Sequence, residues 1–154
     1  MFKQILSAAA CLGLLFAAAP AKAEGQKPES LSSLSAVLYE PESGRVLYEK
    51  DAHTPRPMAS TTKLMTALLA MENAAPDQNV VVTREAILVE GSALGLREGD
   101  NIFMLDLVTG LLLESGNDAA NTIALTVSGS LPAFAEKMNQ KAKELGMKDS
   151  VFVT

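Results

Sequence analysis

Cysteine, histidine and tryptophan are nearly missing from this sequence of 154 residues, which contains one, one and none of them. The only cysteine, Cys11, falls in an N-terminal segment with the pattern of a cleaved leader, so no disulfide is expected. A single histidine, His53, and no second cysteine are too few ligands for a zinc site. Lys and Arg number 13 against 18 Asp and Glu, and this acidic balance argues against a nucleic acid partner.

The N-terminal residues 1–23 have the pattern of a secretory signal peptide. A basic start is followed by an apolar run and by an Ala-x-Ala end that suits cleavage before Glu24. The apolar run is short for a bilayer span and continues past Cys11, so an uncleaved membrane anchor or a lipoprotein signal fits less well. We therefore expect an exported protein of the periplasm or cell-wall space, without membrane association after cleavage.

The rest of the chain is expected to contain a polar leader over 24–33 and one domain over 34–154. A mature chain of about 130 residues can bury one core of modest size. Two β-prone runs, over 36–40 and 45–49, are joined by a turn with proline and glycine, and they predict a β-hairpin.

Helical periodicity predicts helices over residues 60–73, 84–89, 101–113, 119–127 and 132–145. We expect the first of them to be central, since nearly all of its surface is apolar and Leu64, Leu68 and Met71 share one stripe. Val80–Val82 and residues 150–154 are candidates for short strands.

Glycine residues predict where two of these helices end. Gly116 should end the helix predicted over 101–113, and Asn117 or Asp118 should cap the helix that follows. Gly146 should end the last helix, in which Leu145 is expected to face the core.

Ser60 is the candidate nucleophile, because it lies at the predicted start of the first helix. Lys63 follows three residues later, so both side chains would share one helical face within hydrogen-bonding reach. A lysine can remove the hydroxyl proton if burial lowers its pKa, and the free N–H groups of the first helical turn could bind an oxyanion. The alternative is that Ser60 is an N-cap and Lys63 a solvated residue of the first turn.

Ser115-Gly116-Asn117 is a second candidate motif, on a sharp turn between two predicted helices. Ser115 could relay a proton, and Asn117 offers both an acceptor for Lys63 and a donor for a substrate amide. The alternative is a turn whose polar residues only cap helices. The two motifs together are far less expected by chance than either alone.

With Ser60-Thr61-Thr62-Lys63, Ser115-Gly116-Asn117 and the stretch 90–100, the sequence resembles the serine D-alanyl-D-alanine carboxypeptidases, the low-molecular-mass penicillin-binding proteins of peptidase family S11. The resemblance runs from about Leu34 to the end. It implies a mixed α+β fold of the β-lactamase and penicillin-binding transpeptidase type, here with the N-terminal β-hairpin and the helical half but without the later strands of the sheet. Ser-Gly-Asn is closer to these carboxypeptidases than to class A β-lactamases, which usually have Ser-Asp-Asn.

The resemblance also implies a reaction. Ser60 would attack the bond between the two terminal D-alanines of a peptidoglycan stem peptide and form an acyl-enzyme, with Lys63 as base. Ser115 and Asn117 would complete the proton relay and position the substrate, and the Ser60 N–H would form half of the oxyanion hole. No metal or organic cofactor is implied, and β-lactam antibiotics would inhibit by acylating Ser60.

The sequence departs from the family at its third motif. No Lys-Thr-Gly or Lys-Ser-Gly occurs, although in the family this motif lies on a central strand that binds the substrate carboxylate. We therefore expect the chain to correspond to the N-terminal part of such a catalytic domain, incomplete at its C-terminus, with uncertain activity of its own. Two alternatives stay open: a catalytically incompetent secreted module that binds peptidoglycan or another partner, and another acyl-serine hydrolase such as a β-lactamase or an esterase.

Overall fold

The computed structural model describes residues 31–153, so the predicted signal peptide and most of the polar leader lie outside the described residues. The chain divides into two compact units, with the boundary between Ala52 and His53.

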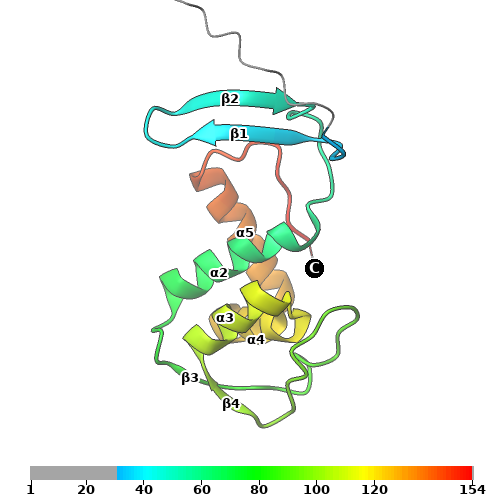
Figure 1. Ribbon diagram of the computed structural model, residues 1–154. Coiled ribbons are helices and arrows are strands. Elements are labelled where there is room, and N and C mark those ends of the chain that lie inside the picture. Colours follow the sequence, from blue (N-terminus) through cyan, green and yellow to red (C-terminus); the bar gives the residue numbers. More distant parts are fainter. Residues whose placement is uncertain (1–30, 154) are drawn as a thin grey trace, which may run out of the picture. The chain divides into compact units, whose positions relative to one another are not determined.

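The first unit contains the predicted β-hairpin. Strands β1 (Ala36–Glu40) and β2 (Arg45–Lys50) pair in antiparallel fashion, with a bulge between Leu38 and Tyr39 (Figure 1). Gly44 closes the turn at a φ of +72°, a value that glycine adopts without steric cost. The hairpin prediction is therefore confirmed.

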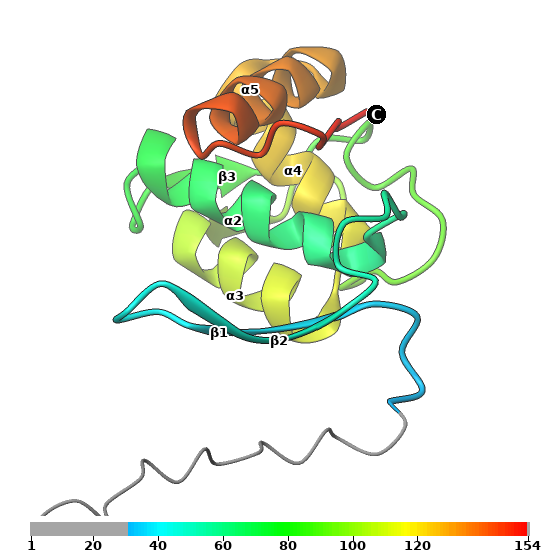
Figure 2. The same cartoon turned by 90° about the horizontal axis from the view of Figure 1, so that it is seen from above.

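The second unit is a helical bundle with one small sheet. Its elements are the 3-10 turn η1 (Ala59–Thr61), helices α2 (Thr62–Asn73), α3 (Met104–Glu114), α4 (Asn117–Ser128) and α5 (Leu131–Glu144), and strands β3 (Asn79–Val81) and β4 (Asn101–Phe103). Helix α4 packs against α2, α3 and α5, and α2 lies alongside α3 (Figure 2). Within the described part of the chain, no helix combines the length and apolar character needed to cross a membrane.

The core of this unit lies between the four helices. Each helix contributes large side chains that are almost fully buried, among them Leu69 of α2, Leu107 of α3, Ile123 of α4 and Phe134 of α5. The predicted central position of the first helix agrees with this packing, since α2 contacts α3, α4 and α5.

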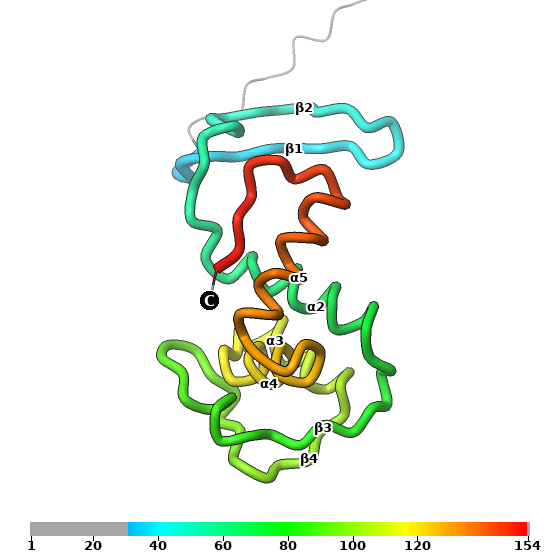
Figure 3. Tube along the Cα trace, turned by 180° about the vertical axis from the view of Figure 1, so that it is seen from behind, coloured from blue at the N-terminus to red at the C-terminus, as the bar shows by residue number. Residues whose placement is uncertain are grey.

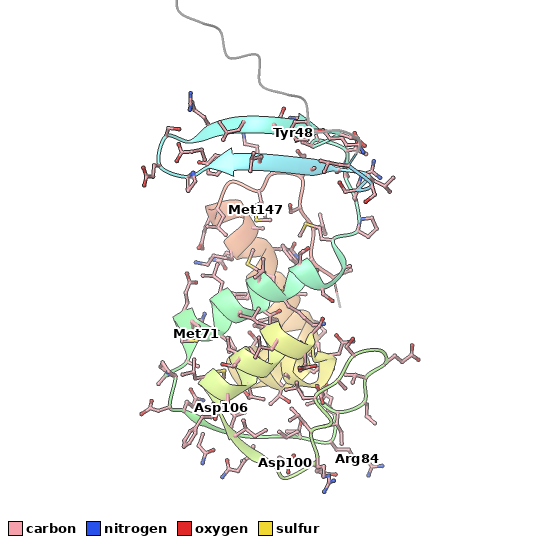
Figure 4. The ribbon with its side chains drawn as sticks, in the orientation of Figure 1. Tyr48, Met71, Arg84, Asp100, Asp106 and Met147 are labelled. Atoms are coloured by element: carbon pink, nitrogen blue, oxygen red, sulfur yellow. The ribbon has the colours of Figure 1, made fainter. Side chains whose placement is uncertain are left out.

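The buried face of α2 differs from the predicted stripe. Leu64, Leu68 and Met71 are 64%, 37% and 40% exposed, and Figure 4 shows Met71 near the end of the helix. The core side is formed instead by Met65, Leu69 and two alanines. Because apolar residues surround this helix, periodicity alone does not identify the face against which small alanines allow close packing.

The predicted helix over 101–113 begins later than expected. Its first three residues form β4, which pairs with β3 and places Ile102 opposite Val80. In α3 itself Leu107 and Leu111 are fully buried, whereas Leu105 and Leu112 are about half exposed. Pairing with β3 therefore overrides the helical pattern at its start.

The predicted short helix over 84–89 does not form. These residues make turns within a loop that connects β3 to β4, and Figure 3 shows this loop to one side of α3 and α4. Hydrogen bonds between the backbones of Val82, Gly99 and Asp100 close its base, and Figure 4 labels Arg84 and Asp100 near its two ends. Six residues are too few to nucleate a helix without tertiary support.

The last helix and the segment after it match the prediction in part. Ser130 caps α5 by accepting from the Ala133 N–H, and Gly146 follows the helix at a φ of +76°, as expected. Leu145, however, is 56% exposed, so its predicted core position is wrong.

The strand expected over 150–154 is not formed by residues 150–153. Phe152 is nevertheless buried, and its backbone N–H and carbonyl are bound by the side-chain amide of Asn139 at 2.8 and 2.7 Å. The Asn139 amide thus binds the backbone groups of Phe152 that a neighbouring strand would bind in a sheet.

Candidate active site

Ser60 lies in the turn η1, directly before α2. The N-cap of η1 is Met58 and the N-cap of α2 is Thr61, so the Ser60 hydroxyl caps neither element. Ala59, which precedes Ser60, has a φ of +46°, a region that residues other than glycine seldom adopt. The structure therefore removes the capping explanation of Ser60 and leaves its hydroxyl exposed at the start of a buried helix.

Lys63 is half-buried in the first turn of α2 and faces oxygen atoms from a distant part of the chain. Its Nζ donates to the Ser115 carbonyl at 2.6 Å, to Ser115 Oγ at 2.8 Å and to Asn117 Oδ1 at 2.7 Å. Burial lowers the pKa of Lys63. Lys63 is therefore partly desolvated, in the direction that the prediction of a base requires.

Ser115 forms the link between Lys63 and Ser60. Its Oγ donates to Ser60 Oγ at 2.7 Å and accepts from Lys63 Nζ at 2.8 Å. The direct bond between Ser60 and Lys63 that α-helical spacing suggests is not formed in the described structure, because Ser60 belongs to a 3-10 turn and not to α2. The two residues are therefore coupled through the second motif.

The turn between α3 and α4 differs from the predicted one. Ser115, not Gly116, adopts the left-handed conformation that ends α3, with a φ of +58°, while Gly116 has an ordinary φ of −65° and is the N-cap of α4. Close packing requires glycine at position 116, because a Cβ there would lie 2.8 Å from Leu94 Cγ and 2.9 Å from Asp118 Oδ1. The sequence does not distinguish a glycine needed for its φ from one needed for close packing.

Asn117 has both ends of its side-chain amide engaged. Oδ1 accepts from Lys63 Nζ, and Nδ2 donates to the Glu90 carbonyl at 2.6 Å. Its backbone N–H donates to the Ser92 carbonyl at 2.8 Å. Asn117 does not cap α4, so one of the two capping candidates is excluded, and the contacts fix which end of the amide faces Lys63.

Asp118, the other capping candidate, is bound in a different way. Its carboxylate is buried, with Oδ1 accepting from Leu94 and Ala119 N–H and Oδ2 from Gly95 and Leu96 N–H, all at 2.9 to 3.0 Å. Burial raises the pKa of Asp118, but the four backbone donors outweigh it and hold the pKa below its usual range. Sequence reasoning missed this contact with residues 94–96, since an aspartate in a first helical turn ordinarily indicates a cap.

The site thus contains hydroxyl, amine and amide groups and is suited to activating a hydroxyl for attack on a carbonyl. Within residues 31–153, no group of three or more His, Cys, Asp or Glu side chains is arranged to hold a metal ion. The four residues predicted for the site, Ser60, Lys63, Ser115 and Asn117, lie together in one hydrogen-bonded network.

A serine directly before a helix and a lysine in its first turn, joined by a Ser-x-Asn turn, correspond to the first two motifs of penicillin-binding enzymes. The D-alanyl-D-alanine carboxypeptidase family, peptidase S11, matches residues 21–154, and the chain belongs to this family.

The chain is 37% identical to D-alanyl-D-alanine carboxypeptidase DacF of Bacillus subtilis over 139 residues, which cover 86% of this chain and 36% of that protein. It is 34% identical to a D-alanyl-D-alanine endopeptidase of Pseudomonas aeruginosa, with coverage of 89% and 45%. The crystal structure of the D-alanyl-D-alanine carboxypeptidase DacD from Francisella tularensis superposes with a TM-score of 0.77 at 32% identity, covering 81% of this chain and 32% of that one.

These likenesses confirm the predicted α+β fold of the penicillin-binding type. The chain spans 36 to 38% of the length of the carboxypeptidases that it matches first. Its match therefore covers an N-terminal portion of those proteins.

Proposed function

We propose that this chain provides the acylation site of a serine-type D-Ala-D-Ala carboxypeptidase, which removes the terminal D-alanine from peptidoglycan stem peptides. The supporting observation is the continuous path from Ser60 Oγ through Ser115 Oγ to Lys63 Nζ, with steps of 2.7 and 2.8 Å. Membership of the S11 family supports the same substrate class. The sequence pattern of residues 1–23 supports export to the periplasm or cell-wall space, where this substrate lies.

The contacts of Lys63 favour a relay through Ser115. The Ser115 carbonyl and Asn117 Oδ1 can only accept, so two of the hydrogens on Lys63 Nζ point toward them. When Lys63 is neutral, its lone pair occupies the remaining direction, toward Ser115 Oγ. The Ser115 hydroxyl then donates to Lys63 and accepts from Ser60, which prepares Ser60 for attack.

In the proposed reaction, Ser60 Oγ attacks the carbonyl carbon of the penultimate D-alanine and a C–O bond forms. The Ser60 proton passes to Ser115 Oγ while the Ser115 proton passes to Lys63 Nζ. The C–N bond then breaks, and the leaving D-alanine nitrogen takes a proton back along the same path. Water attacks the resulting ester, releasing the shortened peptide and restoring Ser60.

Acylation of Ser60 and full turnover of the substrate are expected to differ in this chain. The backbone N–H of Ser60 would supply one oxyanion donor, whereas in the family the second donor and the substrate carboxylate site belong to the Lys-Thr-Gly strand, which this sequence does not contain. Loss of one oxyanion donor typically lowers the rate by a factor of about 100 to 1,000. We therefore propose slow acylation, including acylation by β-lactams, as the activity of this chain.

Two other functions remain as candidates. One is a secreted module that binds peptidoglycan without cleaving it. A β-lactamase-like hydrolase would use the same Ser60 ester but hydrolyse it quickly.

Incubation with a labelled penicillin, followed by mass spectrometry of the intact chain, tests the proposal. A covalent adduct is expected on wild type and on Thr61→Ala, which removes a neighbouring hydroxyl that bonds only to the Met58 carbonyl. The adduct should be lost in Ser60→Ala. Folded wild-type protein without an adduct would favour the binding module, and released D-alanine against hydrolysed penicillin would separate carboxypeptidase from β-lactamase.

A further inference from the structure

The loop over residues 90–96 is bound to the start of α4 along its whole length. Asn117 binds its first half, through the carbonyls of Glu90 and Ser92. Asp118 binds its second half, through the N–H groups of residues 94–96. Two consecutive residues, one of them in contact with Lys63, therefore determine the position of the same loop.

The loop in turn determines the orientation of Asn117. An asparagine amide can rotate by half a turn, which would exchange its oxygen for its nitrogen. The Glu90 carbonyl accepts only, so it selects the orientation in which Nδ2 faces the loop and Oδ1 faces Lys63. Gly91 packs closely here, since a Cβ on it would lie 3.4 Å from Asn117 Nδ2. Displacement of the loop would therefore release the acceptor that holds Lys63.

We propose that Asp118 is a positioning residue of the acylation site: its carboxylate fixes the backbone of residues 94–96, and the loop so held keeps the Glu90 carbonyl on Asn117 and Asn117 Oδ1 on Lys63. The inference rests on the proposed function for its effect on acylation. Its effect on Lys63 does not depend on any activity.

The chemistry of Asp118 suits this role. A carboxylate can accept several hydrogen bonds at once, and here each oxygen receives two backbone donors. The side chain is only 2% exposed and belongs to the residue that follows Asn117, so its position is coupled to the motif through one peptide bond. An amide at this position would turn an N–H₂ group toward backbone N–H donors and would lose at least one of these contacts.

The test measures the pKa of Lys63 by NMR titration of its ¹³Cε signal in the full chain. In Asp118→Asn we expect this pKa to fall by about half a unit or more, because the ammonium loses a well-placed acceptor. Acylation by labelled penicillin, followed across pH, should slow by about tenfold or more, as expected for a displaced catalytic group.

Thr122→Val is the matched control. Thr122 lies one turn further along α4, is also 2% exposed, and donates only to the Asp118 backbone carbonyl. This variant should change neither the Lys63 pKa nor acylation. If Asp118 contributes only to stability, Asp118→Asn and Thr122→Val should have the same Lys63 pKa and the same acylation rate. That result would overturn the proposal.

Gly95→Val decides the question if Asp118→Asn does not fold. Gly95 is exposed, and its φ of +79° is strongly unfavourable for a β-branched residue, so the loop would shift while the core stays intact. It should lower the Lys63 pKa in the same direction. An unchanged Lys63 pKa in folded Asp118→Asn or Gly95→Val protein would contradict the inference. Folded wild-type protein that is not acylated by labelled penicillin would refute only the proposed function.

Discussion

Lys63 Nζ lies 2.8 Å from Ser115 Oγ, although 52 residues separate them in the sequence. The same ammonium also binds the Ser115 carbonyl, so a single residue supplies two of its three acceptors. This is possible because Ser115 adopts a left-handed conformation at the end of α3.

Replacing Lys63 by methionine should change the pH dependence of stability. Burial lowers the folded-state pKa of Lys63, so the unfolded chain binds its proton more tightly. Its penalty on stability is present below the folded pKa and disappears as the pH rises toward the unfolded value of about 10.4. Denaturant unfolding of both proteins from neutral to alkaline pH should therefore show wild type gaining stability relative to Lys63→Met. A difference that stays constant with pH would contradict this prediction.

Ser115→Gly and Ser115→Ala should separate backbone strain from chemistry. The φ of +58° at Ser115 disfavours alanine but not glycine, so Ser115→Gly should be more stable than Ser115→Ala by about 1 kcal/mol. Both variants lack the hydroxyl and should lose acylation. Thermal unfolding and penicillin labelling, measured side by side, check this. Equal stability of the two variants would indicate that the left-handed turn is not maintained in solution.

Gly116→Ala should destabilise the protein by about 1 to 3 kcal/mol, as overpacking of a close contact does. Its φ of −65° suits any residue, so the effect comes from the added Cβ near Leu94 and Asp118. Gly129→Ala is the contrasting control, because Gly129 has a φ of +75° and no atom within 4 Å of an added Cβ. Both variants should lower the free energy of unfolding, but only Gly116→Ala should slow acylation. Unimpaired acylation in folded Gly116→Ala would refute the close contact.

The site was more predictable than the packing around it. Ser60, Lys63, Ser115 and Asn117 were identifiable because each combines a reactive side chain with a position at a helix end, where few residue types are expected. The exposed positions of Leu64, Leu68 and Leu112 were not predictable, since apolar residues surround these helices and tertiary contacts decide which side is buried.

Two features of the site could not be found from local patterns. Glycine propensity favours Gly116 as the residue that ends α3, whereas Ser115 adopts the left-handed conformation and places its two oxygens on Lys63. The contacts of Asp118 join residues more than twenty positions apart, and no short-range rule predicts them. Functional sites are where such departures from local propensity are expected.

The most direct test of the account is a double-mutant cycle on the rate constant for acylation of Ser60 by penicillin. Because the proton reaches Lys63 only through Ser115, Ser115→Ala and Lys63→Ala should each slow acylation by a similar factor, about 100 to 10,000. The double variant should be no slower than either single variant, as for residues that act as one unit. Near wild-type acylation in Ser115→Ala, or losses that multiply in the double variant, would contradict the relay.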